Sequence, residues 1–149
     1  MPDVESPARI VVGVDGSTPS IRALHWAADH AAATAAELDV VTAWTFPEHA
    51  APLGVVPEVP WPEVLVVEAA HALEELVTTE LGGRAGTPLV VTRVERGTAG
   101  QVLVQAARGA QLLVVGNRGR SPVTELLLGS VSEYCIRHAS CPVAVVRGR

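Results

Sequence analysis

The stretch Arg9-Ile-Val-Val-Gly-Val-Asp-Gly-Ser17 joins a short β-branched run to a turn signal. β-Branched residues favour strands, and Asp-Gly-Ser is typical of a turn. Directly after it, apolar residues recur every three or four positions, as they do on one face of a helix. Ser17 or Thr18 is suited to cap that helix, and Pro19 suits its first turn. The opening of the chain therefore predicts a strand, a turn and a helix.

This strand-and-helix unit repeats along the chain. Further strands are predicted at residues 38–44, 89–94, 112–116 and 142–146. Further helices are predicted at residues 63–81, after Gly97-Thr98 and from Ser130. The predicted strands are apolar throughout, which suits a parallel sheet that is covered on both sides. With right-handed crossovers, the alternation predicts an α/β fold: a three-layer sandwich with a five-stranded parallel sheet and helices on both faces.

The length of 149 residues suits one domain, which we place at residues 1–149. Residues 1–8 precede the first strand and are expected to form a flexible N-terminus. Residues 46–62 are rich in proline and lack a helical period. Because structureless connections of that length are uncommon, we interpret them as a functional flap or a disordered segment. Trp61 in this flap is a candidate to cover a ligand.

The composition excludes several classes of protein. Lysine is absent and all 11 basic residues are arginine, which excludes Schiff-base enzymes, Walker-A loops and kinase-type lysines. The net charge of −5 argues against a nucleic-acid partner. No apolar run suits a membrane span and no signal peptide is visible, so we expect a cytoplasmic protein without a membrane partner. Cys135 and Cys141 are expected to be reduced packing residues.

Glycines gather after the predicted strand at residues 112–116, in Gly116-Asn-Arg-Gly119, and again where Gly129 and Ser130 open a helix. Open parallel sheets bind ligands beyond the carboxyl ends of their strands. Glycine lets the backbone approach a ligand closely, and the free N–H groups at a helix start favour an anion. This pattern is consistent with a phosphate cradle.

Several further groups would complete such a cradle: the Ser130 hydroxyl, the N–H groups of Val131 and Ser132, and the guanidinium groups of Arg118 and Arg120. The same segment also fits a structural interpretation. Gly-x-x-Gly is ordinary turn chemistry, and Ser130 with Glu133 has the spacing of a capping box, as Thr98 has with Gln101. The residues alone leave both interpretations open.

The pattern Gly116-x2-Gly119-x9-Gly129-Ser130 resembles the ATP-binding motif of the universal stress protein family. The ending from Gly129 to Val146, with its Cys141-Pro142 pair before the last strand, is also similar to that family, as is the opening from Ile10 to Ser17. The resemblance implies a sheet in the order 3-2-1-4-5. It also implies a homodimer formed through the last strand, here Val143–Val146.

The resemblance implies positions for bound ATP. Asp15 is expected to reach the nucleoside, with the backbone near Gly13 on the same wall, and Ala43 is expected to meet the adenine through its main chain. The ribose and phosphates are expected along Val115, Gly116, Gly119, Gly129, Ser130 and Val131. Thr42 stands where the family frequently has a histidine. Magnesium is an expected companion of the triphosphate, with ATP itself supplying most of its ligands.

We therefore expect an ATP-binding regulator, a nucleotide sensor of the stress response that acts on a further protein partner. No side chain is evidently placed to activate water, so binding is favoured over catalysis and neither catalytic residues nor protein metal ligands are assigned. Two alternatives stay open. One is a slow ATPase or nucleotide-dependent enzyme, in which Asp15 or a loop residue orients the nucleophile. The other is a nucleotide-free dimeric interaction module, in which the glycines only make turns.

Overall fold

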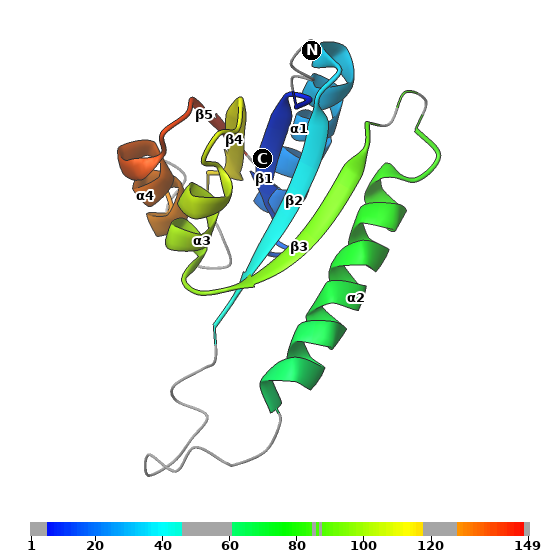
Figure 1. Cartoon of the computed structure of the whole chain (residues 1–149), viewed down its shortest axis with the longest axis vertical. Helices are drawn as coiled ribbons and strands as arrows, with labels where there is room; N and C mark the ends of the chain where they lie inside the picture. The colour runs from blue at the N-terminus through cyan, green and yellow to red at the C-terminus, as the bar shows by residue number, and fades with distance from the viewer. Residues whose placement is uncertain (1–5, 46–60, 85, 87, 118–127, 148–149) are drawn as a thin grey trace, which may run out of the picture.

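The computed structural model of the chain describes residues 6–45, 61–84, 86, 88–117 and 128–147. Strands and helices alternate along it without exception among these residues (Figure 1). The elements are β1 (Arg9–Gly13), α1 (Thr18–Thr34), β2 (Glu37–Trp44), α2 (Trp61–Leu81), β3 (Val90–Arg96), α3 (Ala99–Ala106), β4 (Leu112–Gly116), α4 (Ser130–His138) and β5 (Val143–Val146).

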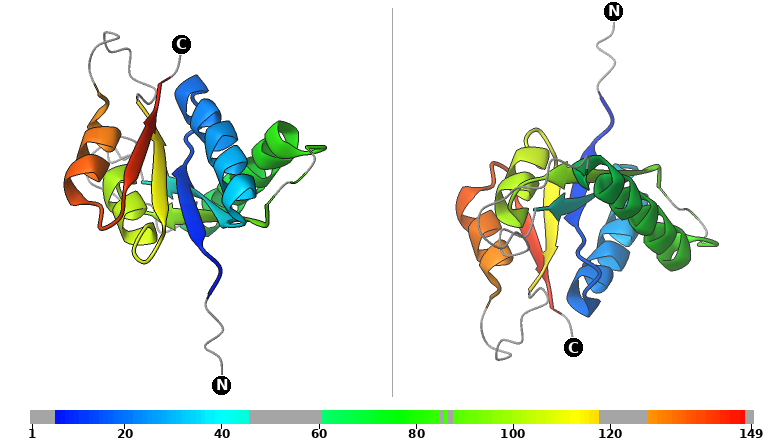
Figure 2. Two further views of the ribbon diagram at one scale, coloured as in Figure 1. Left: turned by 90° about the horizontal axis from the view of Figure 1, so that it is seen from above. Right: turned by 90° about the horizontal axis from the view of Figure 1, so that it is seen from below.

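The five strands form one parallel sheet in the order β3-β2-β1-β4-β5, so the predicted α/β fold and strand order are confirmed. Helices α1 and α2 lie on one face of this sheet, and α3 and α4 lie on the other (Figure 2). The order reverses between β1 and β4, because β1 continues into α1 on one face whereas β4 leads to α4 on the opposite face. In open α/β sheets, such a reversal opens a crevice at the carboxyl ends of the strands.

The core has two apolar layers, one on each face of the sheet. Because side chains alternate along a strand, Ile10 and Val12 pack toward α1 and α2, whereas Val11 packs toward α3 and α4. The strands are apolar on both faces for this reason. Cys135 of α4 is wholly buried in the second layer, and burial, with a smaller contribution from Cys141, raises its pKa to about 11. Both cysteines are free thiols.

The predicted boundaries hold to within about two residues at most elements. The strand expected at 89–94 runs from Val90 to Arg96 instead, since its pairing with β2 continues as far as Trp44. Gly83, with φ of +80°, follows the end of α2 as expected. The expected flap at 46–62 lies outside the described residues apart from its last two positions, which begin α2. The side chain of Trp61 is likewise not described.

The expected flexible N-terminus at 1–8 is described only from residue 6. Within that part, the carbonyl of Ala8 accepts a hydrogen bond from the Glu37 N–H at 2.8 Å, so pairing with β2 begins one residue before β1. None of the helices in the described part of the chain is long and apolar enough to cross a membrane.

Candidate functional site

A cleft of about 440 Å³ opens at the carboxyl ends of the strands, between the end of β2, the β3–α3 connection and the start of α4. Its volume lies within the range of about 300–1,000 Å³ that is usual for small-molecule sites. We call this cavity the strand-end cleft. Its lining residues are Ala43, Thr45, Gly97, Thr98, Ala99, Gly100, Gln101, Ser130, Val131 and Tyr134.

Two helix N-termini converge on the strand-end cleft. The first intrahelical hydrogen bond of α3 runs from the Val102 N–H to the Thr98 carbonyl, and that of α4 runs from the Glu133 N–H to the Gly129 carbonyl. The N–H groups in the first turn of an α-helix have no acceptor within the helix. The first turns of both helices line the cleft, so these donors and the positive ends of two helix dipoles meet there.

Neither of these helix starts carries a side-chain cap. In α1, by contrast, the Ser17 side chain accepts a hydrogen bond from the Ser20 N–H. Thr98 occupies the N-cap position of α3, but its side chain makes no capping hydrogen bond, and the N-cap of α4 is Gly129, which has no side chain to offer. Among the described residues, no capping side chain therefore satisfies the free donors at the cleft.

The expected capping box of Ser130 with Glu133 is wrong. The helix begins one residue earlier than that motif requires, so Ser130 is the first helical residue and not the cap. The Ser132 hydroxyl, which is buried, donates to the Gly129 carbonyl at 2.9 Å. Among the described residues, the exposed Ser130 hydroxyl has no hydrogen-bond partner, which leaves it available to a ligand.

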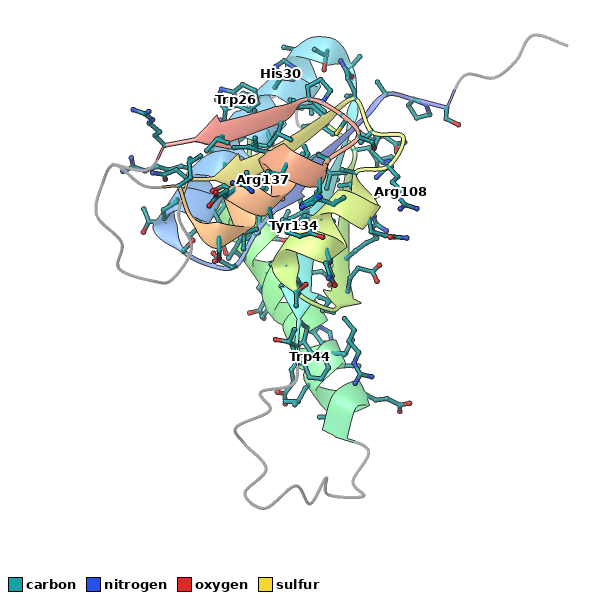
Figure 3. The ribbon with its side chains drawn as sticks, turned by 90° about the vertical axis from the view of Figure 1, so that its left-hand side faces the viewer. Trp26, His30, Trp44, Arg108, Tyr134 and Arg137 are labelled. Atoms are coloured by element: carbon teal, nitrogen blue, oxygen red, sulfur yellow. The ribbon has the colours of Figure 1, made fainter. Side chains whose placement is uncertain are left out.

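Close packing of α3 against α4 brings the two N-termini together (Figure 3). Gly100 makes this possible, because a Cβ at that position would lie 2.7 Å from Cδ1 of Tyr134. The Tyr134 ring packs directly on the glycine, and it also contacts the His138 ring at a centroid distance of 4.3 Å. Gly97, with φ of +139°, turns the chain from β3 into α3. These two glycines shape the cleft, although the sequence analysis assigned neither to the site.

The strand-end cleft brings together Ala43, Ser130 and Val131 from the set of predicted residues. Ala43 comes from the end of β2, and the other two come from the first turn of α4. The other described residues of the predicted site do not line the cleft. They lie at the ends of β1 and β4 or at the start of α4: Gly13, Asp15, Val115, Gly116, Gly129 and Ser132. Arg118, Gly119 and Arg120 lie outside the described residues.

Asp15 has a local structural role. Its side-chain Oδ1 accepts a hydrogen bond from the Ser17 N–H at 2.9 Å, so the carboxylate stabilises the turn between β1 and α1. Asp15 is nevertheless an exposed residue. Thr42 also has a structural role, since its hydroxyl donates to the Val14 carbonyl at 2.8 Å and ties β2 to the end of β1.

Asn117, which the sequence analysis did not single out, joins the two glycine-bearing segments. Its N–H donates to the Val146 carbonyl at 3.0 Å, and its carbonyl accepts from the Gly129 N–H at 2.7 Å. The ends of the intervening segment are thus one hydrogen bond apart. Gly116 beside it has a packing reason to be glycine, because a Cβ there would lie 2.9 Å from the backbone carbon of Pro19.

The described lining of the strand-end cleft contains no charged side chain. Its polar groups are the hydroxyls of Thr45, Thr98, Ser130 and Tyr134, the Gln101 amide and the backbone N–H groups. The described lining contains no carboxylate or imidazole that could act as a general base. Among all the described residues, no cluster of metal-ligating side chains occurs. Such a lining can bind a polar or anionic ligand through neutral donors.

Fold and cleft together define a doubly wound parallel α/β protein with a polar cleft at its strand ends. Residues 8–147 match the Universal stress protein family, and the chain belongs to that family. Universal stress protein Rv2624c of Mycobacterium tuberculosis is 34% identical over 142 residues, covering 94% of this chain and 48% of the relative. The chain thus spans about half the length of the curated relatives it matches.

Solved structures of the family share the fold. Universal stress protein UspA from Lactobacillus plantarum superposes with a TM-score of 0.73 at 23% identity, covering 94% of this chain and 97% of that one. A universal stress protein in complex with cAMP has a TM-score of 0.67 at 28% identity, covering 97% of this chain and 99% of that one. Some structural neighbours of this chain therefore bind nucleotides.

Proposed function

We propose that the chain is a nucleotide-binding regulator of the stress response that takes ATP in the strand-end cleft. The observation that carries the proposal is the convergence of two helix N-termini without side-chain caps on one cleft. Free N–H groups and helix dipoles favour an anion, and a polyphosphate is the anion that two such sites side by side suit. The cAMP complex of a relative supports a nucleotide as the class of ligand.

In this proposal, the phosphates lie against the first turns of α3 and α4 and the Ser130 hydroxyl donates to them. The end of β2 at Ala43 receives the base, and Asp15 is accessible to the nucleoside from the neighbouring strand end. Gly119 and Arg118, which lie outside the described residues, would add to the phosphate site by their place in the glycine motif. Because no lysine is present in the chain, the proposed phosphate donors are backbone N–H groups, hydroxyls, the Gln101 amide and arginines.

The cleft suits binding better than hydrolysis. An ATPase needs a group that orients or deprotonates the attacking water. The described lining offers hydroxyls and an amide but no carboxylate or imidazole. The Asp15 carboxylate already accepts a hydrogen bond from the Ser17 N–H. Magnesium would be held mainly by the triphosphate, since no cluster of metal-ligating side chains occurs in the described residues.

Isothermal titration calorimetry with ATP, AMP and cAMP tests this proposal. We expect ATP to bind with a Kd of micromolar to millimolar order and to bind more tightly than AMP, because its additional phosphates meet more donors. Ser130→Ala should weaken ATP about three- to tenfold while leaving AMP less affected, since one hydrogen bond to a charged group contributes about 1.5 kcal/mol or less at an accessible site.

Ser140→Ala is the matched control, because Ser140 is exposed in the α4–β5 connection and does not line the cleft. It should leave the affinity for every nucleotide unchanged. Absence of ATP binding at millimolar concentration would refute the proposal. Phosphate release that disappears in Ser130→Ala but persists in Ser140→Ala would favour the ATPase alternative.

We propose further that two copies associate through β5. This strand is an edge of the sheet, and an uncovered edge offers unpaired backbone groups to a second chain. Exposed apolar side chains occur on the helices that contact β5. Trp26 of α1, which stacks on His30 beside β5 in Figure 3, is 41% exposed, and Ile136 of α4 is 49% exposed. Light scattering after size exclusion should give a dimer, and Trp26→Glu should shift it toward monomer. Val64→Glu on α2 should not, and a wild-type monomer at micromolar concentration would contradict this interface.

A further inference from the structure

A second and larger cavity runs along α3 on the face of the sheet that α3 covers only in part. It has a volume of about 720 Å³, and we call it the arginine groove. Its walls are α3 and the β2–β3 half of the sheet. Its lining residues are Arg9, Asp39, Arg93, Glu95, Arg96, Gly97, Gln101, Val102, Gln105, Ala106 and Arg108.

The groove exists because α2 and α3 pack on opposite faces of the sheet, and no described helix covers β3 on the α3 side. Strand β3 therefore presents one row of side chains to solvent on this face. Val91 in this row is 43% exposed, and Leu89, in line with it just before the strand, is 64% exposed. Parallel strands are normally buried on both faces, so this uncovered half of the sheet is unusual.

A buried carboxylate organises the floor of the groove. Asp39 of β2 accepts hydrogen bonds from Arg93 at 2.6 and 3.0 Å and from Arg9 at 3.1 Å. Arg9 also donates to the Ala106 carbonyl at 2.7 Å, and the bond to Asp39 raises the pKa of Arg93 above its ordinary value. Both guanidinium groups are therefore fixed in place, and neither can swing freely into solvent.

Positive charge exceeds negative charge in the groove. Four arginines face two carboxylates, Asp39 and Glu95, although the whole chain carries a net charge of −5. Oε1 of Glu95 lies 3.6 Å from Nη1 of Arg93. Within the part of the chain that the structure describes, no carboxylate pairs with the side chains of Arg96 or Arg108. The groove lining thus includes two arginines, Arg96 and Arg108, that no carboxylate of the described residues neutralises.

These two arginines lie at opposite ends of α3. Arg96 ends β3 just before the helix, and Arg108 follows the helix, where Figure 3 shows it away from the strand-end cleft. The helix between them has 8 residues and is about 12 Å long at 1.5 Å per residue. An extended chain covers that length in about four residues, at roughly 3.3 Å each. The spacing suits a peptide segment better than one compact anion.

We propose that the arginine groove is a docking site for an extended acidic segment of another protein. Its carboxylates would bind the guanidinium groups of Arg96 and Arg108, for which the planar fork of arginine is well suited. Gln101 and Gln105 on the wall offer amides to the peptide backbone, and the exposed Leu89 and Val91 receive apolar side chains. This proposal does not depend on nucleotide binding in the strand-end cleft.

Fluorescence anisotropy with a labelled peptide of about eight residues, alternating glutamate and valine, tests the proposal. We expect saturable binding with a Kd on the order of 10–100 µM that weakens as salt rises. The matched peptide with glutamine in place of glutamate should bind at least about fivefold more weakly, because it lacks the charges. In 15N-resolved NMR spectra, the acidic peptide should shift resonances of Gln101 and Gln105.

The test variant is Arg96→Gln/Arg108→Gln, since neither side chain is paired in the described fold. It should weaken the acidic peptide about five- to tenfold. Arg22→Gln/Arg147→Gln removes the same charge outside the groove lining and should leave binding unchanged.

Three results would overturn the proposal. The two double variants could lose the same affinity for the acidic peptide, or the glutamine peptide could bind as tightly as the acidic one. The acidic peptide could also fail to saturate the protein up to about 1 mM. Two other occupants would also overturn it. If only inorganic tripolyphosphate bound at the groove, the ligand would be a phosphate and not a peptide. If Arg96→Gln/Arg108→Gln instead abolished self-association, a second copy of the chain would occupy the groove.

Discussion

Replacing Gly100 by alanine tests how the strand-end cleft is built. The added Cβ would lie 2.7 and 2.8 Å from two carbons of the Tyr134 ring and 3.1 Å from its Cβ, compared with about 3.5 Å for an ordinary contact. Overpacking of this kind costs about 1–3 kcal/mol. Alanine is better than glycine inside a helix by about 0.5–1 kcal/mol. We therefore expect Gly100→Ala to lower the free energy of unfolding by up to about 2.5 kcal/mol.

A double-mutant cycle with Tyr134→Ala separates the two effects. Tyr134→Ala removes the two ring carbons and leaves only its Cβ, 3.1 Å from the added methyl group, so Gly100→Ala should stabilise the Tyr134→Ala protein by up to about 0.5–1 kcal/mol. The assay is urea denaturation followed by circular dichroism. With a slope of about 1–3 kcal/mol per molar, the wild-type background should lose up to roughly 1 M in midpoint whereas the other background gains. Equal shifts in both backgrounds, or a gain in the wild type, would refute the packing argument.

The other expectations concern the buried carboxylate, the buried thiol and the two cavities. Asp39→Asn should cost about 3 kcal/mol of unfolding free energy, because two fixed guanidinium groups lose their shared partner; a cost no larger than that of the exposed Asp29→Asn would contradict this. Because burial raises the pKa of Cys135 from 9.0 to about 11, the thiol stabilises the fold fully below about pH 9, and this stability is lost as pH rises toward 11. The urea midpoint should fall more steeply between about pH 9 and pH 11 than in Cys135→Ala, and parallel profiles would exclude that origin. The cleft and the groove share Gly97 and Gln101, so ATP and the acidic peptide should change each other's Kd by one common factor in calorimetry. Independent Kd values would show that the two cavities are uncoupled.

The order and type of the elements could be predicted from the sequence because each depends on local patterns. Apolar β-branched runs such as Ile10–Val12 form strands that are buried on both faces, and the three- and four-residue spacing after Pro19 forms α1. The end of α2 follows from Gly82-Gly83 in the same way. These patterns lie within a few residues of the strand, helix or turn that they specify, so they can be recognised without knowing which elements pack against each other.

The candidate site was only partly predictable. The glycine spacing from Gly116 to Gly129 correctly placed the start of α4 at the carboxyl edge of the sheet. The capping box of Ser130 with Glu133 was wrong, because the same residues are compatible with a helix start shifted by one position. The contribution of α3 was missed altogether, since its N-terminus reaches the cleft through tertiary packing on α4, in which Gly100 lies against Tyr134.

Asp39 shows most clearly what could not be predicted from the sequence alone. The sequence by itself determined a doubly wound α/β chain with glycine-marked strand ends, because turn and strand preferences act between near neighbours. It left a carboxylate in the middle of an apolar strand without explanation. Only the tertiary structure decided its role, by placing Arg9 and Arg93, which are 30 and 54 residues away, on the same face of the sheet. A buried charge is stable when opposite charges surround it, and that balance depends on strand order and register.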